Sequence, residues 1–213
     1  MNDFAFTGGR PDPDTFPTEK LIEASAKALQ NLGGNLVNYP GDNGYQGLRE
    51  VCSLRFKRRE GVPLPIDQIS ITSGSMQSLD LILRNLLEPG DIVLTEELVY
   101  SGTLGLLRHL NTNIIGVPLD YVEGLDPDAL EDILIDFHHK NIKPKLIYVT
   151  PNHQNPTGAI LTLERRKRLI ELAEKFDLII VEDDCYGDID FTPEPIPDSL
   201  FKLDQSNRVI YVA

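Results

Sequence analysis

Short apolar runs alternate with longer amphipathic segments from position 69 to the end of this chain. The amphipathic segments carry apolar residues at the spacing of a helix face, whereas the apolar runs are too short for helices. Fully apolar strands separated by helices are typical of a parallel sheet that is covered on both faces. The sequence therefore predicts an α/β fold with a mainly parallel, doubly wound sheet.

The same pattern places the individual elements. Strands are expected at residues 69–72, 92–95, 113–117, 145–149, 178–181 and 208–212. Helices are expected at residues 18–32, 46–60, 75–87, 100–110, 127–140 and 162–176, the last with Thr162 as its N-cap. Residues 1–19 are rich in Gly, Pro and Asp and are predicted to form an extended N-terminal arm.

The charge and the cysteine content narrow the class of protein. A formal net charge of −13 argues against a nucleic-acid surface and against an anionic membrane. The basic clusters at residues 55–59 and 165–168 lie in helical patterns and are expected to form solvated faces. Cys52 and Cys185 fit neither a disulfide framework nor a zinc site, which favours a reducing cytoplasm.

The sequence shows no pattern typical of targeting or of metal binding. No apolar run reaches the roughly 20 residues that span a bilayer, and the first residues lack the pattern of a secretory signal. The four histidines show no metal-ligand spacing: His109, His138, His139 and His153. We therefore expect a cytoplasmic protein without a membrane segment or a metal site.

Polar residues follow several of the expected strands. In doubly wound sheets, ligands bind beyond the carboxyl ends of the strands. Ser75 opens a helix after Gly74, where free backbone amides can receive a phosphate, although ordinary helix capping explains such a turn equally well. Asn155 lies in a Pro- and Gly-containing loop that is otherwise a simple turn, and Asp183 ends an apolar strand in what is otherwise an acidic loop.

Two of these segments form a recognisable pair of motifs. The run Asn155-Pro156-Thr157-Gly158 and the spacing Asp183-x-x-Tyr186 resemble the signatures of class I/II aminotransferases, the fold-type I enzymes that use pyridoxal 5'-phosphate. The resemblance implies that Asn155 and Tyr186 donate to the phenolic oxygen of the cofactor, and that the bond before Pro156 is cis. It also implies that Asp183, rather than its neighbour Asp184, pairs with the pyridine nitrogen, because an opposite charge keeps that nitrogen protonated.

Further cofactor contacts follow from the same resemblance. The phosphate is expected to bind the backbone amides around Ser75, Met76 and Gln77. Tyr100 occupies the place of an aromatic residue that stacks on the pyridine ring, and aromatic faces favour offset stacking. These residues complete the cofactor-binding set implied by the resemblance.

The amino-terminal part is expected to serve a homodimer. Tyr39 lies in a segment similar to a family pattern whose tyrosine reaches the cofactor phosphate of the neighbouring subunit. Gly9 and Arg10, in the arm, are candidates for contact with the substrate. The resemblance assigns residues 1–40 to an arm and a helix of the small-domain and interface region, and residues 41–213 to an incomplete cofactor-binding large domain.

The lysine that binds the cofactor covalently is missing from this pattern. In the family, the strand that matches residues 208–213 leads into a Ser-x-x-Lys turn, and none of the nine lysines here lies in such a turn. No catalytic residue is therefore assigned. We expect the amino-terminal portion of a truncated aminotransferase, inactive alone, whose whole form moves an amino group between an α-amino acid and a 2-oxo acid.

Two alternatives remain open. A lyase or decarboxylase of the same fold would use the same cofactor, since the pose of the substrate selects the bond that breaks. A non-catalytic module would resemble the aminotransferase-like effector domain of certain transcription regulators. Those regulators carry a basic DNA-binding domain at the amino terminus, whereas this chain begins with the arm.

Overall fold

A computed structural model describes residues 9, 11–191 and 195–213 of the chain. Its centre is a five-stranded parallel sheet in the order β2-β1-β5-β6-β7. The strands are β1 (Ile92–Glu96), β2 (Asn113–Val117), β5 (Leu146–Val149), β6 (Ile179–Asp183) and β7 (Val209–Val212). They coincide with five of the six expected strands and confirm the parallel α/β fold.

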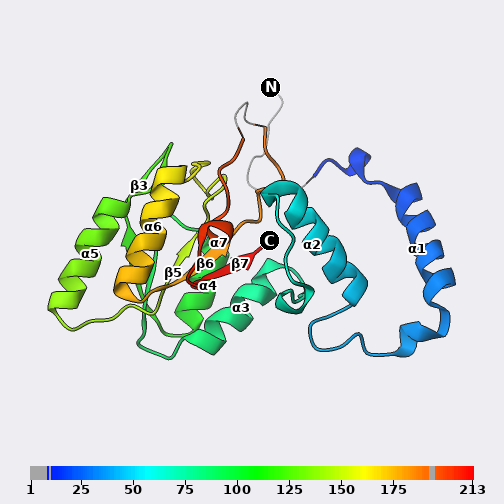
Figure 1. Cartoon of the computed structure of the whole chain (residues 1–213), viewed down its shortest axis with the longest axis horizontal. Helices are drawn as coiled ribbons and strands as arrows, with labels where there is room; N and C mark the ends of the chain where they lie inside the picture. Colours follow the sequence, from blue (N-terminus) through cyan, green and yellow to red (C-terminus); the bar gives the residue numbers. More distant parts are fainter. Residues whose placement is uncertain (1–8, 10, 192–194) are drawn as a thin grey trace, which may run out of the picture.

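Helices cover both faces of the sheet (Figure 1). On one face, α3 (Ser75–Leu86) and α4 (Ser101–His109) bury leucines against alternate strand residues such as Val93 and Val181. On the other face, α5 (Pro127–His139), α6 (Leu163–Phe176) and α7 (Leu200–Leu203) pack against the intervening residues. The sheet is therefore doubly wound, as expected, and successive strand residues point into different clusters.

The order of the strands reverses at β1. The chain passes from β1 outward to β2 and then returns to place β5 on the other side of β1. Connections that leave neighbouring strands in opposite directions open a crevice at the carboxyl ends, where such sheets bind ligands. All strands of this sheet are parallel, so the residues that follow β1, β5 and β6 gather at one edge.

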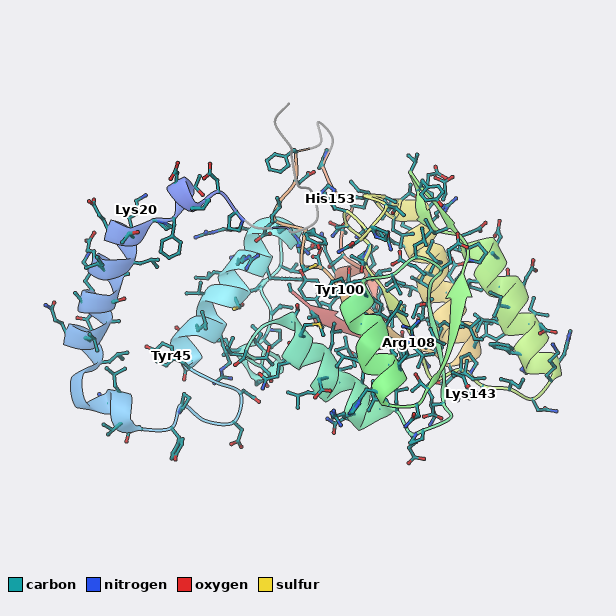
Figure 2. All side chains as sticks on the ribbon, turned by 180° about the vertical axis from the view of Figure 1, so that it is seen from behind. Lys20, Tyr45, Tyr100, Arg108, Lys143 and His153 are labelled. Atoms are coloured by element: carbon teal, nitrogen blue, oxygen red, sulfur yellow. The ribbon has the colours of Figure 1, made fainter. Side chains whose placement is uncertain are left out.

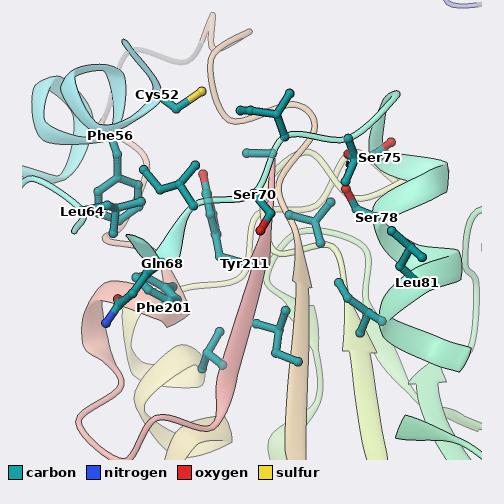
Figure 3. A pocket seen from close by; sticks show the side chains of 18 of the residues that line it. Cys52, Phe56, Leu64, Gln68, Ser70, Ser75, Ser78, Leu81, Phe201 and Tyr211 are labelled. Atoms are coloured by element: carbon teal, nitrogen blue, oxygen red, sulfur yellow. Dashed lines mark hydrogen bonds between the residues drawn. The ribbon is translucent and has the colours of Figure 1, made fainter. Parts of the chain in front are cut away.

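The prediction of a strand at residues 69–72 is wrong. These residues have no strand assignment, although Ile69 has the extended torsions φ −107° and ψ 127°. A strand needs a neighbouring backbone, and the amide of Ile71 instead donates to the carbonyl of Asn43 in a loop, at 3.0 Å. A cavity of about 820 Å³ is lined by this segment and by β7 (Figure 3).

Two α-helices come before α3 in the chain. The bounds of α1 (Thr18–Leu32) and α2 (Gln46–Glu60) agree with the sequence expectation. However, α1 has no buried residue and stands apart from the body of the chain, with Leu21, Ile22 and Leu29 exposed (Figure 1). Its apolar stripe is therefore uncovered in a single chain, and the division at residues 1–40 and 41–213 stays a prediction.

Several short elements were not expected. They are the strand pair β3 (Leu119–Asp120) and β4 (Gly124–Leu125), the helix α7, and the 3₁₀ turns η1 (Pro13–Thr15), η2 (Gly33–Val37) and η3 (Ile66–Gln68). Elements this short have no periodic pattern in the sequence. No helix in the described part of the chain is long and apolar enough to cross a membrane.

Candidate functional site

Asp183 ends β6 with its carboxylate inside the protein. The residue is 4% exposed, and its Oδ2 atom accepts a hydrogen bond from the hydroxyl of Tyr148 at 2.5 Å. Among the described residues, none forms a hydrogen bond of good geometry with the other oxygen, Oδ1, which is buried. Burial raises the pKa of Asp183, and the hydrogen bond from Tyr148, followed by the nearby thiol and amide of Cys185, opposes that rise. A buried carboxylate oxygen without a partner is costly, and it is therefore a candidate ligand atom.

Asp184 points to the opposite side, as the alternation along an extended segment predicts. Its Oδ1 atom accepts from the Asn152 amide at 2.6 Å, and its Oδ2 atom accepts from the Tyr211 hydroxyl at 2.6 Å. Arg59 of α2 forms an ion pair with the same carboxylate at 2.5 Å. Both of its oxygens are therefore engaged in the protein, and Asp183 is the acid that remains available.

Asn155 and Tyr186 are in direct contact. The Asn155 amide donates to the Tyr186 hydroxyl at 3.1 Å, although 31 residues separate them in the sequence. The peptide bond between Asn155 and Pro156 is cis, which confirms the expectation from the motif. A shallow pocket of about 400 Å³ is lined by both residues, together with His153 and Ile189.

Two buried polar residues hold the loop that carries Asn155. Gln154 donates to the carbonyl of Leu98 at 2.5 Å, and its side-chain oxygen accepts from the Thr157 amide at 3.0 Å. Glu96, at the end of β1, accepts from the Thr150 amide at 3.1 Å. Burial raises the pKa of Glu96 to about 8, and these donors counteract only part of the rise. The loops after β1 and β5 are thereby joined at the switch point of the sheet.

The first turn of α3 lies at the same edge. Gly74 precedes it with φ 84°, a torsion that glycine adopts without strain, and no side chain caps the helix. Ser75 is partly buried at one end of the 820 Å³ cavity, whereas Met76 and Gln77 are exposed (Figure 3). The side chain of Gln77 accepts from the Ser73 amide at 2.6 Å. The Gln77 amide donates to the Gly74 carbonyl at 3.2 Å, so the turn offers the amides of Ser75 and Met76 and the Ser75 hydroxyl to an anion.

Tyr100 directly precedes α4 and is 42% exposed. Its ring folds over the start of that helix, where Gly102 leaves room that a Cβ atom would fill. Tyr100 and His153 lie toward one end of the sheet, with Arg108 and Lys143 toward the other (Figure 2). Tyr100 is thus at the edge where Asn155 also lies.

The structure brings some of the expected residues together and leaves others apart. Asn155 and Tyr186 line one pocket and Ser75 lines a different cavity, and neither lining includes Asp183 or Tyr100. Tyr39 is 99% exposed, and Gly9 is also exposed. Arg10 falls outside the described residues.

The expectation of solvated basic faces is wrong for part of both clusters. Arg166 is fully buried, and its guanidinium donates to the carbonyls of Leu161, Pro151 and Asp198 and to the side chain of Asn152 at 2.6–3.1 Å. The side chain of Arg59 is 24% exposed because it pairs with buried acids. A helical pattern cannot distinguish an exposed arginine from one that has buried acceptors.

Sequence reasoning also missed Tyr148, Glu96 and Gln154. Tyr148 is the one hydroxyl-bearing residue of the buried strand β5, and a buried tyrosine usually has a hydrogen-bond partner. That combination was a usable signal for Tyr148. Glu96 follows an apolar strand in the same way as Asp183, but no local pattern shows that it faces inward.

Comparison with known proteins identifies the family. The model of class I and II aminotransferases matches residues 7–212. Aromatic-amino-acid aminotransferase 1 of Thermococcus litoralis is 36% identical over 98% of this chain and 49% of its own length. The 2-aminoadipate transaminase of Thermus thermophilus is 36% identical over 93% of this chain and 47% of its own length.

A solved structure agrees with these sequence matches. The kynurenine aminotransferase of Pyrococcus horikoshii, in complex with PMP, superimposes with a TM-score of 0.88 and 36% identity over 96% of this chain and 50% of its own. The chain spans about half the length of these relatives. Because the match covers nearly all of its residues, the chain belongs to the class I and II aminotransferase family.

Proposed function

We propose that this chain binds pyridoxal 5'-phosphate at the carboxyl ends of β1, β5 and β6. We also propose that the whole protein moves an amino group between an α-amino acid and a 2-oxo acid. Family membership and the relatives named above support both statements. The observation that carries the proposal is the buried Oδ1 atom of Asp183, at the edge where such sheets bind ligands, to which no described residue forms a hydrogen bond of good geometry.

The residues at this edge fit the polar groups of the cofactor. The free oxygen of Asp183 would accept from a protonated pyridine nitrogen. Asn155 has a second amide hydrogen and Tyr186 has a hydroxyl hydrogen, so both can donate to the phenolic oxygen while they remain in contact. Ser75 and the amides that begin α3 would hold the phosphate, and the ring of Tyr100 would lie against the pyridine.

Each of these residues has a distinct task. Pyridoxal phosphate, when bound, supplies an electron sink that makes the α-carbon of an amino acid acidic. Asp183 keeps a proton on the ring nitrogen because its negative charge stabilises the cation in a site shielded from water. Asn155 and Tyr186 orient the ring by hydrogen bonds. None of these tasks needs a lysine, and we propose that the 213 residues bind the cofactor without a covalent bond.

The substrate class follows from the relatives. The named similar proteins act, by their descriptions, on aromatic amino acids, 2-aminoadipate and kynurenine. We propose an amino acid with an aromatic or a long acidic side chain as the amino donor of the whole protein.

We further propose that the protein is a homodimer. The exposed stripe of Leu21, Ile22 and Leu29 on α1 and the fully exposed ring of Tyr39 supply an apolar surface that a second subunit would cover. Tyr39 would then approach the phosphate site of the partner.

Titration with pyridoxal phosphate tests the cofactor proposal. We expect saturable binding, and Asp183→Asn should weaken it roughly 30-fold or more, because loss of one member of a buried charge pair costs about 2 kcal/mol or more. Asp136→Asn is the control, since this exposed carboxylate pairs with Lys140 on the surface of α5. Borohydride followed by mass spectrometry should show no site-specific adduct. Equal affinities of the two variants would refute the assignment of Asp183.

A further inference from the structure

Tyr148 connects the buried core of the sheet to the candidate site. It lies on β5 opposite Val181 of β6, so Asp183, two residues further along β6, is on the same face. Its ring is fully buried in the cluster formed with α3 and α4, which includes Leu79, Leu83 and Leu107. The hydroxyl alone reaches the edge of this cluster, where it donates to Asp183 at 2.5 Å. The packing of the ring therefore fixes where the hydroxyl lies.

The direction of this hydrogen bond is determined by its surroundings. Burial and the charge of Asp183 both raise the pKa of Tyr148, so the phenol keeps its proton and acts as the donor. The hydroxyl of Thr150 donates to the Tyr148 oxygen at 3.5 Å, which orients the Tyr148 hydrogen toward the carboxylate. Tyr148 is consequently a fixed donor to Oδ2.

A carboxylate in this position needs such a donor. Among the described residues, the neighbouring ionisable groups are Cys185, Asp184 and Tyr186 on the same segment, Glu96 from β1, and Tyr148 from β5. None of these five is a cation. Burial favours the protonated acid, and a carboxyl group that holds a proton on Oδ1 cannot accept from a pyridinium. Hydrogen-bond donation by Tyr148 is therefore the largest stabilisation of the ionised form, and the thiol and amide of Cys185 add smaller ones.

We propose that Tyr148 is a positioning residue of the cofactor site: its hydroxyl holds one oxygen of Asp183 and leaves the other oxygen ionised and directed at the pyridine nitrogen. This inference rests on the proposed function, because it assigns the ligand of Oδ1. It adds a role for a strand residue that has no contact with the exposed pocket. Tyr148 acts on the cofactor through Asp183 alone.

The test replaces Tyr148 by Phe, which keeps the buried ring and removes the hydroxyl. The 213-residue chain without cofactor is titrated by NMR with ¹³Cγ-labelled aspartate, and the Asp183 signal is assigned with Asp183→Asn. We expect the pKa of Asp183 to rise by about one unit or more in Tyr148→Phe, because a hydrogen bond to a charged group is lost. The matched control is Tyr211→Phe on the adjacent strand β7. It removes the hydroxyl that donates to Asp184 and should leave the Asp183 pKa unchanged.

The hydroxyl proton of Tyr148 and the affinity for the cofactor provide two further tests. In the wild-type chain, the Tyr148 hydroxyl proton should give a downfield, slowly exchanging signal that disappears in Asp183→Asn, which needs no folded Tyr148 variant. Pyridoxal phosphate should bind Tyr148→Phe more weakly, with a difference that grows to about tenfold as the pH falls below the Asp183 pKa, because only there does a shift of one pKa unit lower the ionised fraction tenfold. An unchanged Asp183 pKa and unchanged affinity in Tyr148→Phe would overturn the role of Tyr148 alone. Absence of cofactor binding by the wild type would overturn the proposed function and this role with it.

Discussion

Replacement of Arg166 by Met tests the buried polar network behind the site. The guanidinium is fully buried and makes four hydrogen bonds, to the carbonyls of Leu161, Pro151 and Asp198 and to the Asn152 side chain. Asn152 in turn donates to Asp184 at 2.6 Å. Met fills a similar volume without any donor, so the substitution removes the charge and the hydrogen bonds but keeps most of the packing.

The size of the expected loss of stability follows from the burial of Arg166. Burial lowers the pKa of Arg166, and the negative charges of Glu182, Asp184 and Glu60 oppose that effect. Removing one partner from a buried ionic group costs about 3–5 kcal/mol, since the remaining charges lose their compensation. A domain of this kind is stable by only about 5–15 kcal/mol, so the loss would be a large share of the total. We expect the free energy of unfolding to fall by about 3–5 kcal/mol.

Urea denaturation followed by circular dichroism measures this loss, with Arg168→Met as the control. Arg168 lies two residues further along α6, is partly exposed, and pairs with Glu131 and Glu171 at the surface. Surface ion pairs contribute about 1 kcal/mol or less, so the control should change stability little. If Arg166→Met cost no more than Arg168→Met, the reasoning about the buried network would be refuted.

Two other predictions concern pH and assembly. Burial raises the pKa of Glu96 from 4.5 to about 8, so the folded state keeps a proton that the unfolded state loses, and stability falls as the pH rises between these values. Denaturation at a series of pH values should show that the free energy of unfolding falls less in Glu96→Gln than in the wild type. An identical fall in both proteins would disprove the raised pKa of Glu96. For assembly, Leu29→Glu on the exposed stripe of α1 should lower the mass found by sedimentation, whereas Lys27→Glu on the polar face of the same helix should not; a monomeric wild type would contradict the dimer.

The periodicity of apolar residues was sufficient to predict most of the helices and strands. The apolar runs at β1, β5 and β6 are buried on both faces, so their sequence shows them directly. The bounds of α6 were predictable because Thr162 caps it and accepts from the Arg165 amide at 3.4 Å. Residues 69–72 have the composition of a strand, but a strand also needs a neighbour in space, and no local pattern contains that information.

The candidate site was harder to predict from the sequence than the fold. Asn155 and Tyr186 were expected to act on the same atom, and their hydrogen bond places them together. The motif spacing selected Asp183 over Asp184, and the alternation of side chains along β6 agrees with that choice. Tyr148 and Arg166 were missed because their roles depend on which buried partner they meet, and tertiary packing alone determines those partners.

The most direct test of the central claim is the protonation state of the bound pyridine nitrogen. Pyridoxal phosphate labelled with ¹⁵N in the ring would be bound to the chain, and the nitrogen chemical shift would be recorded for wild type and Asp183→Asn at neutral pH. The account predicts the shift of a protonated nitrogen in the wild type and of an unprotonated nitrogen in the variant. The same shift in both proteins would contradict the claim that Asp183 receives the cofactor.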